Sequence, residues 1–108
     1  MNANKTDSNL LKQSIDGIFR ISYKNIPVSD RHDITTRLVR VIIEREQTGE
    51  YFSKKKVETE LIPFFTRSYI RHRKTGYDDL IDHGTPKWKA RKMVANYVDQ
   101  LYKWWSRK

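Results

Sequence analysis

The side chains of this sequence that could take part in chemistry concentrate between residues 71 and 83, where basic, imidazole and carboxylate groups stand close together. Asp78 and Asp82 are four residues apart, a spacing that puts both carboxylates on one face of a helix. A metal-dependent nuclease needs such clustered carboxylates, and His72 or His83 could add a ligand. Aspartates are also typical of the first turn of a helix, where negative charge is stabilised. We therefore predict no metal site, and a metal-dependent nuclease stays the alternative.

Other catalytic motifs are missing from the sequence. None of the three histidines stands in an H-E-x-x-H arrangement, and there is no G-x-S-x-G elbow or glycine-rich phosphate loop. The absence of cysteine excludes thiol catalysis, cysteine-ligated zinc and disulfides. We predict a protein that is not an enzyme, has no catalytic residues and needs no cofactor.

The positive charge lies mainly in the second half of the chain. Residues 1–50 hold 8 Lys/Arg against 7 Asp/Glu, a difference of +1, whereas residues 51–108 hold 14 against 6, a difference of +8. A basic half of this kind is the electrostatic footprint of a polyanion-binding protein, although a merely solvated basic surface has the same composition. We predict DNA or RNA as the partner, bound through its phosphates. The expected contact residues are Lys54, Lys55, Lys56, Arg67, Arg71, His72, Arg73, Lys74, Lys87, Lys89, Arg91 and Lys92.

Aromatic side chains are interleaved with these charges near the C-terminus, at Trp88, Tyr102, Trp104 and Trp105. Aromatic rings among cations can stack on unpaired bases. Adjacent tryptophans on a helix cannot both face one core, so one of them could belong to an exposed apolar patch that binds a partner. The alternative function is therefore a helical protein-interaction module, a homo-oligomer or a small subunit of a nucleoprotein assembly. In the purely structural interpretation, Trp105 lies in the core, and Trp104 and Tyr102 cover the flank of a neighbouring helix.

The length of 108 residues predicts one domain, over residues 8–108, preceded by a disordered polar lead-in at 1–7. The lead-in lacks the apolar core of a signal peptide. No apolar run approaches the roughly 20 residues of a membrane span, so we expect no membrane partner. The lack of cysteine is consistent with a cytoplasmic protein.

Apolar spacing predicts an all-α, compact bundle of about five helices and no strand. The first helix spans 8–22, with Ser8 as its N-cap, and the second runs from a cap at Asp30 to about Thr48. On the second helix, Arg37 and Arg40 could form a binding face, but the i, i+4 spacing of Arg40 and Glu44 favours a surface ion pair.

The third helix begins near Ser53, is kinked at Pro63 and continues to Arg73. A short fourth helix covers 76–83. Thr85-Pro86 is a strong start signal for a long C-terminal helix over 86–106. The side chains expected to face the core from the third and last helices are Val57, Leu61, Phe64, Phe65, Tyr69, Ala90, Val94, Tyr97, Val98, Leu101 and Trp105.

The joint between the third and fourth helices allows two interpretations. In the structural one, Thr75 and Asp78 form a capping box, an arginine pairs with a nearby aspartate, and His72 bonds a backbone carbonyl. In the functional one, the arginines and His72 join the N-terminus of the last helix in a cationic phosphate pocket. In either case Arg67, Arg71 and Lys74 are expected to share an outward face.

The pattern Ile70-Arg71-His72-Arg73-Lys74-Thr75-Gly76-Tyr77-Asp78-Asp79-Leu80, followed by Ala90-Arg91 and by Val94, Val98, Leu101 and Trp104 or Trp105, resembles the uncharacterised DUF2293 family. That family carries an IRH-x-x-T-x-Y-x-x-L segment, then an Ala-Arg pair and a terminal helix ending in Trp. The match covers roughly residues 67–105. The resemblance implies a helical domain and directs attention to Arg71, His72, Thr75, Tyr77 and Arg91, without giving them roles.

Overall fold

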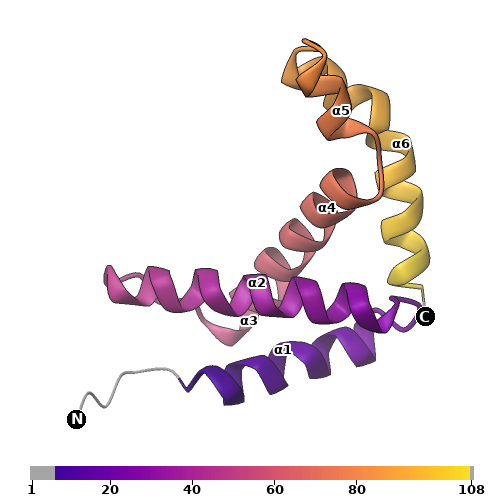
Figure 1. The fold of residues 1–108 in the computed structure, drawn as a ribbon. Coiled ribbons are helices and arrows are strands. Elements are labelled where there is room, and N and C mark those ends of the chain that lie inside the picture. The colour runs from indigo at the N-terminus through magenta and orange to yellow at the C-terminus, as the bar shows by residue number, and fades with distance from the viewer. Residues whose placement is uncertain (1–6, 108) are drawn as a thin grey trace.

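The computed structural model describes residues 7–107, and all regular secondary structure in this range is helical (Figure 1). The elements are α1 (Ser8–Ser22), α2 (Val28–Gln47), α3 (Lys54–Lys56), the π-helical turn η1 (Val57–Leu61), α4 (Ile62–Arg73), α5 (Tyr77–Asp82) and α6 (Lys87–Trp105). The prediction of an all-α fold with a long C-terminal helix is therefore confirmed. Most of the expected lead-in at 1–7 lies outside the described residues.

Two helix N-caps lie at other residues than predicted. Asp7, not Ser8, caps α1: its carboxylate accepts hydrogen bonds from the backbone N–H of Asn9 at 2.9 Å and of Leu10 at 3.3 Å. Helix α2 begins at Val28 directly after Pro27, and Asp30 is a buried residue of its first turn rather than its cap. The fixed φ of proline suits the entry to a helix, and no described side chain caps α2.

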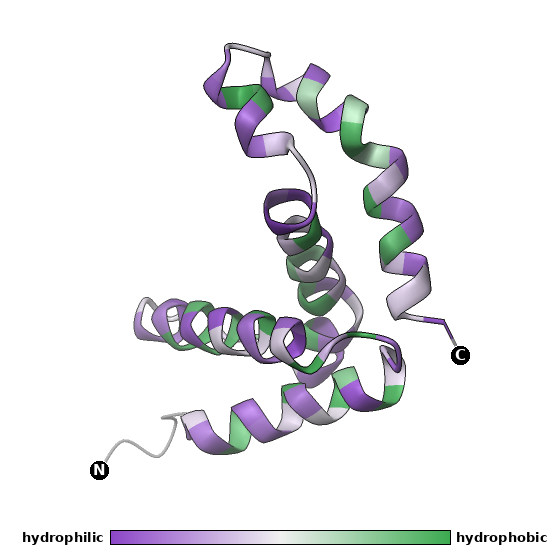
Figure 2. Cartoon of the chain, turned by 45° about the vertical axis from the view of Figure 1, so that its right-hand side comes forward, coloured by the Kyte–Doolittle hydropathy of each residue, from purple (hydrophilic) through white to green (hydrophobic). Residues whose placement is uncertain are grey.

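The main core forms where α1 and α2 lie side by side and α4 packs against both α2 and α6 (Figure 1). Its fully buried side chains include Phe19, Leu38 and Ile70, one from each of three helices. Each long helix carries hydrophilic and hydrophobic residues together, as expected for amphipathic helices around a shared core (Figure 2). Two residues predicted to face the core do not, since Phe64 and Tyr97 are both more than half exposed.

The π-helical turn η1 directly precedes Pro63, the second residue of α4. The N–H of Ile62 bonds the carbonyl of Val57, five residues earlier, which is the hydrogen bond of a π-helix. Proline lacks an N–H, so a change of hydrogen-bonding pattern beside it is physically reasonable. Both features favour a bend, and the kink itself stays a prediction.

The bundle is elongated, with principal extents of 49 × 33 × 21 Å. Its radius of gyration is 15.4 Å, against about 13 Å for a compact domain of this length. Figure 1 shows why: α5 and the first turns of α6 project away from the layer of α1 and α2. Tyr77 and Ala90 are buried in this arm but do not belong to the main core. The arm therefore has a small hydrophobic centre of its own.

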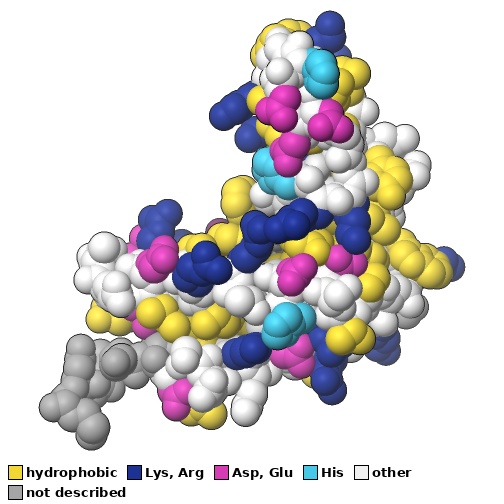
Figure 3. All heavy atoms as spheres, in the orientation of Figure 1, with side chains coloured by type: hydrophobic (Ala, Val, Ile, Leu, Met, Phe, Trp, Pro, Cys, Tyr) yellow, Lys and Arg dark blue, Asp and Glu magenta, His cyan; other side chains and the backbone are white. Residues whose placement is uncertain are grey.

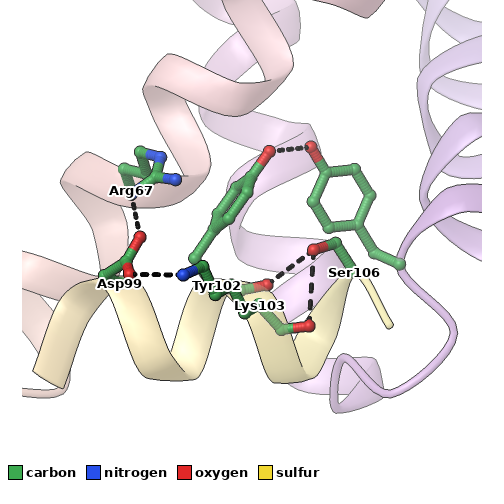
Figure 4. A network of polar contacts seen from close by, with 6 residues as sticks. Arg67, Asp99, Tyr102, Lys103 and Ser106 are labelled. Carbon is green, nitrogen blue, oxygen red and sulfur yellow. Dashed lines mark hydrogen bonds and ion pairs between the residues drawn. The ribbon is translucent and has the colours of Figure 1, made fainter. Parts of the chain in front are cut away.

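Four polar contacts fix the C-terminal part of α6 to the rest of the molecule. The hydroxyls of Tyr23 and Tyr102 are 2.8 Å apart, and Asn25 donates its side-chain amide to the carbonyl of Trp104 at 2.9 Å (Figure 4 shows the tyrosine pair). The backbone N–H of Asn25 also bonds the carbonyl of Trp105 at 3.2 Å. Arg67 of α4 pairs with Asp99 of α6 at 3.4 Å. Burial and the hydrogen bond between the two tyrosine hydroxyls raise the pKa of Tyr23 above its ordinary range.

Candidate nucleic-acid interface

A cleft of about 360 Å³ lies between α2 and α4. Figure 3 shows Lys and Arg side chains gathered along the boundary where α2 meets the projecting arm. The residues lining the cleft are Ile34, Arg37, Arg40, Val41, Phe65, Ser68, Tyr69, His72 and Arg73. Its lining thus combines apolar and aromatic side chains with three guanidinium groups and an imidazole.

A polar cluster around the buried Asp30 and Tyr69 holds the two walls of this cleft together. The carboxylate of Asp30 on α2 accepts a hydrogen bond from the hydroxyl of Tyr69 on α4 at 2.7 Å and lies 3.1 Å from the ammonium group of Lys74. Asp33 accepts a longer bond from the same hydroxyl at 3.2 Å. Burial, together with the bond to Asp30, raises the pKa of Tyr69 above its ordinary range, so the phenol is neutral and available as a donor.

The three arginines of the cleft have no ion pair in the described part of the chain. Arg37 and Arg40 are exposed on α2, and Arg73 is exposed at the end of α4. The predicted pair between Arg40 and Glu44 is not among the ion pairs that the described residues form, so that prediction is wrong. Cations that have no ion-pair partner among the described residues and that face one cleft create a positive potential there, which favours an anion.

Two predicted contact residues instead form ion pairs with aspartates of neighbouring helices. Arg67 pairs with Asp99, and its guanidinium lies 4.1 Å from the centre of the Tyr102 ring (Figure 4). Lys103 approaches the same carboxylate at 3.0 Å, and its hydrogen bond is the largest of the effects that lower the pKa of Asp99. Lys74 is bound to Asp30, as described above. The expected outward face of Arg67, Arg71 and Lys74 is therefore wrong, because these side chains contact three different elements.

The joint between α4 and α5 differs from the predicted capping box. The hydroxyl of Thr75 accepts a hydrogen bond from the N–H of Tyr77 at 3.1 Å and donates to the carbonyl of Arg71. Asp78 does not return to Thr75: its carboxylate lies 2.7 Å from Nδ1 of His72. The predicted bond from His72 to a backbone carbonyl is wrong for the same reason.

The structural interpretation expected Arg71 or Arg91 to pair with an aspartate of α5, but neither arginine forms an ion pair among residues 7–107. The guanidinium of Arg71 lies 5.4 Å from the centre of the Tyr77 ring, and its Nε is buried without a hydrogen-bond partner. A cation over an aromatic face is attracted by the ring quadrupole. Arg71 therefore helps to hold the arm against α4 and is a poor candidate for phosphate contact.

A second hollow of about 380 Å³ lies on the arm, and His72 lines it as well as the cleft. The other lining residues are Tyr77, Asp78, Ile81, Asp82, Lys87 and Arg91. Figure 3 shows acidic and histidine side chains grouped over α5. Two carboxylates face this hollow, so its electrostatic character is mixed, unlike that of the cleft. Within residues 7–107, no group of three or more His, Cys, Asp or Glu side chains is arranged to hold a metal ion.

The remaining predicted cations are exposed at separate places. Lys54, Lys55 and Lys56 form the short α3 behind the Ser53 cap, and the ammonium group of Lys56 lies 5.6 Å from the centre of the Phe52 ring. The first turns of α6 carry the other exposed cations, at Lys87, Lys89, Arg91 and Lys92. That helix begins at Lys87 after Pro86, one residue later than predicted, and has no side-chain cap.

Of the predicted contact residues, the cleft thus includes His72 and Arg73. Sequence reasoning considered Arg37 and Arg40 as a binding face but left them out of the set, because the Arg40–Glu44 ion pair was favoured, although their i, i+3 spacing puts them close together on α2. Only the packing of α4 on α2 brings Arg73 to them.

The aromatic candidates separate into buried and exposed residues. Trp105 is 3% exposed, and its ring lies near Tyr69 in the core, so it is not a surface residue. Tyr102 is half-buried by its contacts with Tyr23 and Arg67. Trp88 and Trp104 are exposed. The interpretation of Trp105 as a core residue agrees with this placement, whereas Trp104, which the same interpretation expected to cover a neighbouring helix, is 51% exposed.

Comparison with protein families gives a match to DUF2293, described as an uncharacterised conserved protein, over residues 18–106. This range includes all four cleft arginine and histidine side chains and extends well beyond the segment that carried the resemblance. No curated protein and no solved structure matches the chain. Over the described residues, no helix combines the length and apolar character that a membrane crossing requires.

Proposed function

Because this chain belongs to the DUF2293 family of uncharacterised conserved proteins, we propose its function from its own surface: it binds DNA or RNA through phosphate contacts and does not act as a catalyst. The cleft between α2 and α4 is the centre of the proposed interface. The cytoplasm is the compartment that we propose, on the cysteine-free composition alone.

One observation carries this proposal. Arg37, Arg40 and Arg73 line the same cleft, and no ion pair of residues 7–107 involves any of them. By contrast, Arg67 and Lys74 are neutralised by aspartates of neighbouring helices. Arginine presents a planar fork of N–H donors that matches phosphate oxygens. A phosphate in the cleft would therefore pair with charges that have no ion-pair partner among residues 7–107.

The distribution of the other charges indicates the path that bound nucleic acid would take over the surface. The exposed lysines of α3 and of the first turns of α6 could contact more distant phosphates, since each adds a weak, salt-dependent attraction. The aspartates of α5 would repel a phosphate chain from the front of the arm. We expect bound nucleic acid to follow the boundary of α2 and α4 rather than the face of α5.

Fluorescence anisotropy with labelled single- and double-stranded DNA and RNA, titrated over salt, tests the proposal. An Arg37→Glu/Arg73→Glu variant should bind much more weakly and should lower the slope of log K against log salt by about 2. The matched control is Lys12→Glu/Lys24→Glu, at two exposed lysines away from the cleft. Both variants lower the net charge from +9 to +5, so total charge cannot explain a difference between them.

No binding to any of the four ligands at low salt would refute the proposal, as would equal losses in the two variants. Incubating the labelled strands with the protein and Mg²⁺ before electrophoresis tests the absence of catalysis. Intact strands are expected, whereas cleavage would favour the metal-dependent nuclease.

A second candidate function rests on a different surface. Met93, Tyr97 and Trp104 of α6 are each more than half exposed, and their spacing puts them along one side of the helix. Exposed apolar lines of this kind are typical of protein-interaction surfaces. Under this alternative the domain is an adaptor, a homo-oligomer or a subunit of a nucleoprotein assembly. Trp104→Ala should then abolish partner binding or self-association, measured by light scattering, and should leave nucleic-acid binding unchanged.

A further inference from the structure

We infer that the cleft between α2 and α4 takes one unpaired nucleotide of a single-stranded nucleic acid, so that the protein prefers single strands to duplexes. This inference rests on the proposed nucleic-acid binding and adds the class of ligand. It starts from the shape of the site, which is a concave space between two helices rather than a projecting helix. A volume of about 360 Å³ is at the lower end of the range for small-ligand pockets, which suits a single nucleotide and excludes a duplex.

The floor of the cleft is suited to a base rather than to phosphate alone. Ile34 is 1% exposed, Val41 and Phe65 are half-buried, and the ring of Tyr69 is buried. Simple phosphate binding requires no apolar or aromatic surface. An unpaired base has a π-face of low polarity that stacks on aromatic rings and packs on aliphatic groups. Phe65 is the half-buried aromatic side chain of this lining, and we assign it to the base.

The rim of the cleft is suited to the phosphates on either side of that base. Arg37 and Arg40 stand one turn apart on α2, and Arg73 stands one turn beyond Tyr69 on α4. Guanidinium groups on both walls can hold the backbone that enters and leaves the cleft. They can also stack on a base, as arginine does in single-strand sites.

A duplex cannot use this arrangement. Its bases are stacked and paired inside, and a protein reads them by inserting an α-helix or a β-ribbon into the major groove. Double-stranded RNA has a major groove too narrow for side chains to read, so it likewise presents its backbone and 2′-hydroxyls. Against a concave cleft, a duplex can therefore offer only phosphates to the arginine rim, without contact to the floor.

The cleft also keeps its shape without a ligand. Asp30 joins α2 to Tyr69 of α4, which lines the cleft, and to Lys74, the residue that follows α4. The two walls are thus held at a set separation, so binding a ligand costs less conformational entropy than it would if the walls had to be ordered first.

The first experiment compares a labelled 12-nucleotide strand with its blunt duplex by anisotropy, at one salt concentration. We expect the single strand to bind at least about tenfold more tightly, a factor consistent with stacking of one base. A third ligand, the same strand with abasic positions throughout, keeps every phosphate and lacks the bases. It should bind as weakly as the duplex.

A variant that fills the cleft tests the same point from the protein side. Ser68→Phe puts a ring into the lining and leaves every charge in place. It should weaken single-strand binding about tenfold and leave duplex binding unchanged. Ser14→Phe is the matched control, on the exposed surface of α1, and should bind as the native protein does.

The results separate the two proposals. Equal binding of single strand, abasic strand and duplex would overturn the nucleotide site and leave phosphate binding intact. Unchanged binding by a folded Ser68→Phe variant would overturn the nucleotide site as well. If that variant does not fold, the abasic strand decides by itself. No binding to any ligand would overturn both proposals together.

Discussion

The Tyr69→Phe substitution should destabilise the domain by about 1.5–3 kcal/mol, since it deletes the hydroxyl that joins α4 to α2. In the native protein this hydroxyl donates to the buried carboxylate of Asp30 at 2.7 Å. Hydrogen bonds to charged groups stabilise proteins more than neutral ones do, and the buried carboxylate that loses this donor keeps, among the described residues, only its ion pair with Lys74 and stays largely out of water. Phenylalanine keeps the ring, so loss of packing adds little. Against a total stability of about 5–15 kcal/mol, such a loss is easily measured.

Urea unfolding followed by circular dichroism gives the free energy of unfolding, and Trp105, whose ring centre lies 6.5 Å from that of Tyr69, gives a second signal by fluorescence. The control is Tyr51→Phe, the same chemical change at an exposed tyrosine with no side-chain hydrogen bond in the described part of the chain. It should change stability by less than about 0.5 kcal/mol. An equal, small effect of both substitutions would refute the role assigned to the Asp30–Tyr69 bond.

The difference in free energy of unfolding between the native protein and Tyr69→Phe should depend on pH, because the pKa of Tyr69 is raised in the folded state. A raised pKa means that the neutral phenol contributes stability fully below the unfolded-state value of about 10. This contribution is lost as pH rises through the folded-state pKa. The variant has no phenol at this position, so its free energy of unfolding should approach that of the native protein above about pH 10. A gap that stays constant to pH 12 would contradict the assignment.

Two further predictions concern the backbone and the α6 surface. Gly84 has φ of +93°, so Gly84→Ala should lower the free energy of unfolding by about 1 kcal/mol or more, measured by thermal unfolding. The control is Gly76→Ala, because Gly76 has φ of −82° and an added Cβ would meet no atom within 4 Å, so stability should not fall. Similar effects of the two substitutions would contradict this reasoning. The pKa of Asp99 is lowered, first by its hydrogen bond from Lys103, so its contribution to stability is present above the ordinary value of about 4 and is lost as pH falls through the lower folded-state value. Asp99→Asn should therefore be less stable than the native protein at pH 7 and equally stable near pH 2, and urea titrations at both pH values would show whether the gap closes.

Local signals in the sequence were sufficient for most helices. The apolar spacing of the first helix predicted 8–22, which is the observed span of α1, and Thr85-Pro86 located the start of α6 to within one residue. These predictions succeed because caps, prolines and the 3.6-residue period act within one helix. The Ala-Arg pair and the terminal tryptophans carried the family resemblance for the same reason, since they can be recognised without knowledge of tertiary contacts.

Predictions that depended on which helices meet were less successful. Asp30 has the residue type and position of an N-cap, yet it is buried, and its partners are Tyr69 of α4 and Lys74, which directly follows α4. Phe64 and Phe65 are equally apolar, and the chain pattern alone put both in the core. The packing of α4 buries much of Phe65 and leaves Phe64 exposed.

The sequence by itself determined that this protein is helical, basic in its second half and a member of its family, because composition and local spacing carry that information. Tertiary structure alone decided which cations have partners and which face a cleft. Arg67 and Arg73 are on the same helix, yet Arg67 pairs with Asp99 of α6, whereas Arg73 lines the cleft together with the arginines of α2. The physical reason is that charge acts through space over a few ångströms, and only packing determines which charges come that close.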